Sequence, residues 1–206
     1  MDTIPMYAEA NSEIIGFPYP DSFQIMVNGL SEKDFAQKLV EEFKLNMTAD
    51  EFVHRRAEIL QKKFLNTKLV PYVDNVVLKL KEMGLPLAVA TGSHRDSHEL
   101  KKTNLQEFFK NFSQEICGDE VAHAKPSPEI FLKAAAKLGD FKPENILIFE
   151  DSYNGIVAAN TAGMASVFLA SGTEPYEEYM KKFNATPSYV VRSFKDFDFN
   201  VFDWEP

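Results

Sequence analysis

The chain has 206 residues, a length that suits one domain or a core domain with a small insert. Its hydrophobic fraction of 45% supplies a sizeable core, and its net charge of -9 argues against a general nucleic-acid surface, which needs clustered Lys and Arg. No run nears the roughly 18 apolar residues of a membrane span, and the N-terminus lacks the features of a signal peptide. Cys117 is the single cysteine, so no internal disulfide is possible and a cytoplasmic location is expected.

The first third of the chain, from Ile4 to about Thr67, has apolar residues at helical spacing and no confident strand. Ser31 can cap one of its helices, and Thr48 with Glu51 forms a capping-box pattern at the start of another. Asn28-Gly29 is a turn signal between less regular residues. This part is expected to be a small helical domain.

After Val70-Pro71 the pattern becomes an alternation of helices with short apolar runs. The helices are expected over 76–83, 94–103, 128–138 and 155–162, and the strands over 85–90, 113–117, 146–149, 165–170 and 189–191. Strands that are apolar along their whole length and separated by helices indicate a parallel sheet covered on both faces. The expected division is therefore a helical domain at 1–70 (about 4–69) and an α/β domain at 71–206.

Ligands of open parallel sheets bind beyond the carboxyl ends of the strands. Three kinds of polar group follow the predicted strands there: a hydroxyl beside backbone N–H groups, a cation, and paired carboxylates. They belong to Thr91-Gly92-Ser93, Lys125, and Glu150-Asp151.

This set suits phosphoryl chemistry. Phosphate oxygens need hydrogen-bond donors and positive charge, which Thr91, the N–H groups of Gly92 and Ser93, and Lys125 can supply. Mg²⁺ prefers oxygen ligands and keeps several waters, so Glu150 and Asp151 suffice for it. Each piece alone has a plainer interpretation, as a turn, a solvated charge or a helix N-cap. The combination in this order is much more specific.

The same residues resemble motifs II, III and IV of the haloacid dehalogenase (HAD) superfamily. The matching segments are Leu87 to Thr91, Ala124 to Leu132, Phe149 to Gly155, and Ala162-Gly163-Met164. Within the superfamily they are most similar to the pseudouridine-5'-phosphatase-like branch, although Ala124 stands where that branch has glycine. The resemblance implies a Rossmannoid parallel sheet with a mobile helical cap, and a Mg²⁺-dependent phosphatase acting on a small phosphorylated metabolite.

The resemblance also implies roles for single residues. Thr91 and Lys125 would hold the transferring phosphoryl group, Glu150 and Asp151 would hold Mg²⁺, and Asn154 would steady their loop. Gly29 would match a cap glycine that faces the active site. The expected substrate is a nucleotide such as pseudouridine 5'-phosphate or a sugar phosphate, and the expected state is a monomer or weak dimer.

One part of the family pattern has no counterpart in the chain. Motif I is a buried strand ending in Asp-x-Asp, whose first aspartate attacks phosphorus and whose second acts as acid and base. Met1-Asp2-Thr3 resembles only the residues that follow this motif. The central first strand and both catalytic aspartates would therefore precede Met1, and the chain is expected to be a truncated, inactive form.

Two substitutes for motif I are weak. Asp2 lies past the catalytic pair and suits a helix N-cap, and Asp196-Phe197-Asp198 follows a polar segment, which favours a surface segment pinned by Phe197 and Phe199. His94 and His98 are four apart on a predicted helix but have no third metal ligand, so solvated side chains are the expectation. A non-catalytic phosphate-binding or regulatory paralogue and a phosphomutase are the rival functions.

Overall fold

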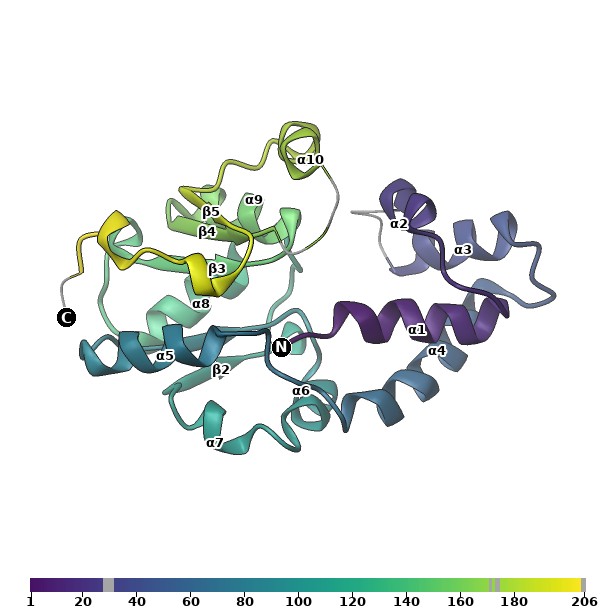
Figure 1. Ribbon diagram of the computed structural model, residues 1–206, viewed down its shortest axis with the longest axis horizontal. Coiled ribbons are helices and arrows are strands. Elements are labelled where there is room, and N and C mark those ends of the chain that lie inside the picture. Colours follow the sequence, from purple (N-terminus) through teal and green to yellow (C-terminus); the bar gives the residue numbers. More distant parts are fainter. Residues whose placement is uncertain (28–31, 171, 173–174, 205–206) are drawn as a thin grey trace. The chain divides into compact units, whose positions relative to one another are not determined.

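The computed structural model describes residues 1–27, 32–170, 172 and 175–204 (Figure 1). The chain divides into two compact units, which are considered separately. One consists of Met1–Lys68 with Leu100–Asn104, and the other of Leu69–Glu99 with Leu105–Pro206. No helix within the described residues is long and apolar enough to cross a membrane.

The first unit is helical, as the sequence predicts. Its helices are α1 (Ile4–Ile15), α2 (Asp21–Val27), α3 (Glu32–Glu42) and α4 (Ala49–Phe64). Helix α4 packs against both α1 and α3. The predicted capping box is confirmed, because Thr48 Oγ1 accepts from the Glu51 N–H at 3.2 Å and the Glu51 carboxylate accepts from the Thr48 N–H at 2.7 Å. Ser31 and Gly29 lie outside the described residues, so the predictions for them stay open.

The core of this unit is aromatic. Phe23, Leu39 and Phe52 are buried together, and Arg56 lies with its guanidinium 4.9 Å from the Phe35 ring centroid while it donates to Glu32 at 2.6 Å. Such a buried cation is stabilised by the ring face and by its carboxylate partner.

The second unit alternates helices and strands. Its elements up to residue 120 are α5 (Val73–Glu82), β1 (Ala88–Ala90), α6 (Arg95–Lys102), α7 (Gln106–Phe109), β2 (Gln114–Ile116) and the 3₁₀ turn η1 (Gly118–Glu120). The residues of α6 from Leu100 onward belong to the first unit. After it come α8 (Glu129–Leu138), η2 (Pro143–Asn145), β3 (Leu147–Glu150), α9 (Tyr153–Ala162), β4 (Ala165–Leu169), α10 (Tyr176–Phe183), β5 (Tyr189–Val191), η3 (Phe194–Asp196) and η4 (Phe199–Val201). The predicted strands and helices are all present with small shifts at their ends, and α7 and α10 are additional helices.

The strands form two parallel sheets in the described residues. One has the order β1-β2. The other has the order β3-β4-β5, whose three strands lie together in Figure 1. One layer of helices serves both sheets, because a single apolar cluster joins α8 and α9 to residues of β1, β2 and β3. On the opposite face, α5 packs with residues of the β3-β4-β5 sheet and with Leu85 and Leu87, which precede β1. The fold is thus a helix-covered parallel α/β fold in which β1 and β3 do not pair with each other.

Candidate active site

The loop after β1 carries Thr91, Gly92 and Ser93, and the neighbouring strand holds it in place. The Thr91 N–H donates to the Ile116 carbonyl at 2.9 Å, and the Gly118 N–H donates to the Ser93 carbonyl at 2.8 Å. Within the loop, Thr91 Oγ1 accepts from the Ser93 N–H at 3.2 Å. A phosphate bound here would meet an exposed Gly92 and would compete with Thr91 for the Ser93 N–H.

Gly118 is needed for this arrangement because two backbone segments meet at it. A Cβ atom on Gly118 would lie 2.3 Å from the Gly92 carbonyl oxygen and 2.9 Å from its carbon. These Gly92 atoms belong to the backbone, so the close contact could be relieved only by moving the loop. Sequence reasoning missed this residue, since its partner lies more than twenty positions away.

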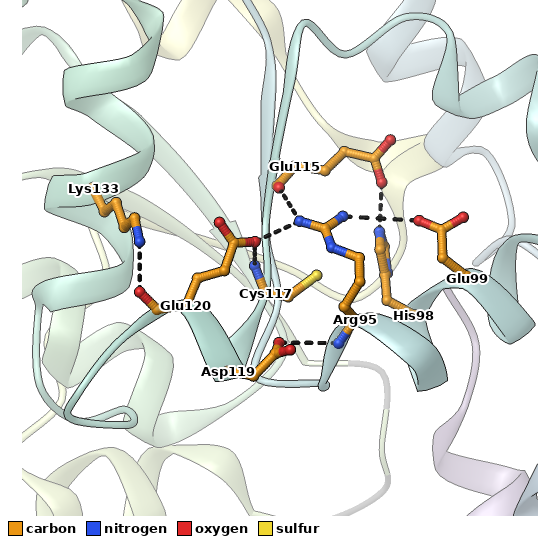
Figure 2. Close-up of polar contacts among 8 residues, drawn as sticks. All are labelled: Arg95, His98, Glu99, Glu115, Cys117, Asp119, Glu120 and Lys133. Atoms are coloured by element: carbon orange, nitrogen blue, oxygen red, sulfur yellow. Dashed lines mark hydrogen bonds and ion pairs between the residues drawn. The ribbon is translucent and has the colours of Figure 1, made fainter.

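A charged network centred on Arg95, directly after this loop, joins the start of α6 to β2 and η1 (Figure 2). The Arg95 guanidinium donates to the Glu115 carbonyl at 2.7 Å and to the Glu120 carboxylate, while its backbone N–H donates to Asp119 Oδ1 at 3.0 Å. The Cys117 N–H donates to the same Glu120 carboxylate at 3.0 Å. This backbone donor and then Arg95 lower the pKa of Glu120, so it remains an anion that joins the start of α6 to η1.

His98 corrects the sequence prediction of solvated histidines. His94 is exposed and precedes α6, but His98 is fully buried. Its Nε2 lies 2.6 Å from a Glu115 carboxylate oxygen, and its ring packs edge-on against Phe109 at 5.4 Å. His98 therefore joins α6 to β2, and within the described part of the chain no three His, Cys, Asp or Glu side chains gather as a metal cluster.

The cation and the first carboxylate are brought together as a nearly buried ion pair. Lys125 Nζ binds Glu150 Oε1 and lies 3.4 Å from the Ala90 carbonyl at the end of β1. Only 16% of the Lys125 side chain and 8% of the Glu150 side chain are exposed. The ammonium also lies 4.5 Å from the Phe131 ring centroid. The plainer interpretation of Lys125 as a solvated charge is wrong, because it contacts the carboxyl ends of both β1 and β3.

The second oxygen of Glu150 organises the turn into α9. It accepts from the N–H groups of Asp151 and Ser152 at 3.2 Å each and from the Ser152 hydroxyl at 2.9 Å. Ser152, rather than Asp151, is the N-cap of α9, and its hydroxyl accepts from the Gly155 N–H at 3.0 Å. A Cβ atom on Gly155 would lie 2.2 Å from the Glu150 carboxyl carbon, so glycine is the residue that admits this carboxylate.

Asp151 is the accessible acid of the pair. Its side chain is left at the surface beside Glu150, yet crowding by protein atoms and the charge of Glu150 raise its pKa. A cation placed against both carboxylates would relieve this repulsion. Two neighbouring carboxylates with one open to solvent fit Mg²⁺, which needs few protein ligands because it keeps waters.

The other candidate residues lie elsewhere. Asn154 occupies the first turn of α9, where its supporting role stays a prediction. The segment around Phe197 is a surface segment, as expected: Phe197 is buried against Phe149, and Asp198 accepts from the Asn200 N–H at 2.9 Å. Asp2 forms an isolated bridge with Lys68 inside the first unit, and Thr3 rather than Asp2 is the N-cap of α1.

The chain belongs to the haloacid dehalogenase-like hydrolases, whose family model matches residues 5–163. It resembles their pseudouridine-5'-phosphatase-like branch: a probable pseudouridine-5'-phosphatase of Drosophila melanogaster is 34% identical over 204 residues, covering 96% of this chain and 86% of that protein. The phosphorylated carbohydrates phosphatase of Thermotoga maritima is 30% identical, covering 82% and 79%. A putative beta-phosphoglucomutase structure from Thermotoga maritima has a TM-score of 0.73 with 26% identity, covering 93% of this chain and 88% of that one.

Proposed function

We propose that this chain forms the phosphate- and Mg²⁺-binding part of a phosphomonoester hydrolase for a small phosphorylated metabolite. The observation that carries the proposal is the Lys125–Glu150 pair at the carboxyl ends of β1 and β3, with Thr91 following one strand and Asp151 the other. It combines a fixed cation, a hydroxyl and an exposed acid, which are the groups that a transferring phosphoryl group and its metal need.

On the phosphate side, Thr91, Gly92, Ser93 and Lys125 would bind the anion. The Thr91 hydroxyl and the loop N–H groups donate to phosphate oxygens, and Lys125 contributes charge from a nearly buried position, where water screens it little. Because Gly118 and Arg95 hold the loop, its donors are ordered before the ligand arrives. Such preorganisation favours tight binding of a compact anion.

On the metal side, Asp151 would be the accessible ligand and Glu150 the second. When bound, Mg²⁺ would neutralise charge on the phosphoryl oxygens. Glu150 remains tied to Lys125 and to the turn before α9, so it fixes the position of Asp151 as well as the charge of the site. Asn154 would support this turn.

The aspartates weighed in the sequence do not replace the Asp-x-Asp pair of motif I. Asp196 and Asp198 belong to the Phe197 surface segment, and Asp2 forms a backbone bridge with Lys68. We therefore propose that the residues described above bind phosphate and Mg²⁺, and that turnover of substrate also needs an Asp-x-Asp nucleophile.

The proposed substrate is a nucleotide of the pseudouridine 5'-phosphate type or a sugar phosphate. The relatives named above as phosphatases of such compounds support this range. Residues 1–70 would act as the cap over the substrate. A cytoplasmic, monomeric or weakly dimeric protein completes the proposal.

The test has two arms. Calorimetry with inorganic phosphate should show binding that strengthens with Mg²⁺ and weakens in Lys125→Met and Asp151→Asn, with Asp140→Asn as a surface control. A version extended at its N-terminus by an apolar strand that ends in Asp-x-Asp should release phosphate from a metabolite panel only with Mg²⁺. Absence of both Mg²⁺-dependent binding and release would overturn the proposal.

Two rivals give different results in the same assays. A non-catalytic paralogue binds phosphorylated ligands, and its extended version still releases no phosphate. A phosphomutase, the function named for one structural neighbour, converts one sugar phosphate isomer to another without net phosphate release. Following both phosphate and sugar isomers therefore separates the three.

A further inference from the structure

Arg192 follows the carboxyl end of β5, at the sheet edge where the proposed Mg²⁺ ligands also lie. Strand β5 ends at Val191 and β3 ends at Glu150, and both run parallel to β4 in one sheet. Ligands of open parallel sheets bind beyond this edge. Arg192 is therefore a further cation, besides Lys125, at the edge that carries the proposed phosphate site.

The strand register places Arg192 on the same face of this sheet as Glu150. Glu150 pairs with Phe168 of β4, and Phe168 pairs with Val190 of β5. Paired residues of parallel strands point to one face, and residues two apart along a strand share that face again. Arg192 lies two residues after Val190, so its side chain is expected on the Glu150 face.

The helices on that face agree with this placement. The Arg192 guanidinium lies 5.1 Å from the ring centroid of Tyr176 in α10, and the Tyr176 ring lies 6.2 Å from that of Phe168. The Glu150 carboxylate lies against Gly155 of α9, and α9 packs against α10 (Figure 1). Arg192 and Glu150 thus share the face that α9 and α10 cover.

Sheet geometry gives the separation of the two residues. Two strand spacings of about 4.8 Å and two residue rises of about 3.3 Å place the Arg192 Cα atom about 12 Å from that of Glu150. The arginine side chain is long enough to shorten this distance by several ångströms. An anionic group at Arg192 would therefore be a second group of the ligand, joined to the first by a short chain of atoms.

The guanidinium is oriented, but most of its hydrogen-bonding capacity is unused. Of its five N–H donors, one makes a long contact of 3.5 Å with the Gly172 carbonyl. The side chain is exposed and has no ion pair with a carboxylate within the described residues. The ring of Tyr176 holds its position. A planar guanidinium with free donors matches a phosphate or a carboxylate, which it can bind through two N–H groups.

Glu177 is the neighbouring negative charge on α10. A hydrogen bond to Glu177 raises the pKa of the Tyr176 hydroxyl, so Tyr176 stays neutral below the guanidinium. The Glu177 carboxylate is thus engaged by Tyr176, although its charge still opposes an anion at Arg192. Glu177→Gln should therefore strengthen the binding of an anionic group there.

We infer that Arg192, stacked on Tyr176, binds a second anionic group of the substrate and is a specificity-determining residue. The inference rests on the proposed function, because the first phosphate would be held at Lys125. The favoured substrate class is a sugar phosphate that carries another phosphate or a carboxylate at the far end of a short chain. A nucleoside monophosphate has its negative charge on one phosphate and would leave Arg192 without a partner.

Calorimetry on the chain as it is, with Mg²⁺ present, can compare hexanediol bisphosphate with propanediol bisphosphate and hexyl phosphate. The two bisphosphates have equal charge and two equivalent ends, but only the longer one should reach both cations. A linked second contact strengthens binding most when the linker matches the span. We expect hexanediol bisphosphate to bind about tenfold more tightly than propanediol bisphosphate, the gain of one charged hydrogen-bonded contact.

Variants assign this preference to a side chain. Arg192→Met should abolish the preference for the longer bisphosphate, and Arg192→Lys should retain part of it, because an ammonium does not bind through a planar pair of N–H groups. Lys182→Met is the matched control: Lys182 is also an exposed cation near an aromatic ring, 5.7 Å from the Tyr179 centroid, but it lies in the last turn of α10. It should leave all three affinities unchanged.

Equal affinities of the two bisphosphates, or a preference that survives in Arg192→Met, would overturn the inference. The Arg192 Nε–H signal in NMR spectra should shift with hexanediol bisphosphate and much less with inorganic phosphate at the same concentration. An equal shift would make a free anion the ligand and would also overturn it. Lys125→Met should weaken all three phosphate ligands. If it weakens none, the proposed function fails, whatever the outcome at Arg192.

Discussion

Gly118→Ala tests whether the phosphate loop is held by backbone packing. The new Cβ would lie 2.3 Å from the Gly92 carbonyl oxygen, far inside the range of real contacts. Overpacking of this kind costs about 1–3 kcal/mol, and displacing the loop also weakens the 2.8 Å hydrogen bond from Gly118 to Ser93, worth about 1 kcal/mol. We expect a loss of about 2–4 kcal/mol in the free energy of unfolding.

Urea denaturation measures this loss. With a typical m-value of about 2 kcal/mol per molar, the midpoint should fall by about 1–2 M. Gly92→Ala is the matched control, because its Cβ would meet no atom within 4 Å, and its midpoint should stay close to that of the parent chain. A Gly118→Ala midpoint equal to that of Gly92→Ala would refute the packing argument.

Three further predictions concern the site and a buried lysine. Gly155→Ala places a Cβ 2.2 Å from the Glu150 carboxyl carbon and displaces a carboxylate that Lys125 and the turn before α9 hold. The free energy of unfolding should therefore fall by about 1–3 kcal/mol, and Mg²⁺-dependent phosphate affinity, read by calorimetry, should fall about tenfold. Lys125→Met should lower the free energy of unfolding by about 3 kcal/mol, because it leaves the Glu150 carboxylate without its ion-pair partner. In a double-mutant cycle, the variant that also carries Glu150→Gln should lose less than the sum of the two single changes. Burial lowers the pKa of Lys101 from 10.5 to about 8. Between these two pH values the unfolded chain binds more protons than the folded chain, so the free energy of unfolding should rise by up to about 3 kcal/mol from pH 8 to 10.5. Lys101→Met should remove that rise in urea titrations, and a rise that persists in this variant would contradict the assignment.

The types of the elements were predictable because the periodicity of apolar residues is strong and glycines mark the ends of helices. Helix α8 ends at Gly139 and α9 at Gly163, the latter in the left-handed conformation that glycine favours. Strand β5 was predicted with its observed bounds. Helix α10 was not predicted, since no glycine or capping residue marks its start: Pro175 precedes it without a side-chain cap.

The site was predictable as a set of residue types but not as a set of contacts. Lys125 and Glu150 follow from the motifs, whereas the approach of Gly155 to Glu150 depends on the turn that Ser152 caps. The Arg95–Glu120 pair spans 25 positions, and no local pattern signals it. The positions of the charged residues along the chain are known from the sequence, but only the packing of the fold determines which of them form ion pairs.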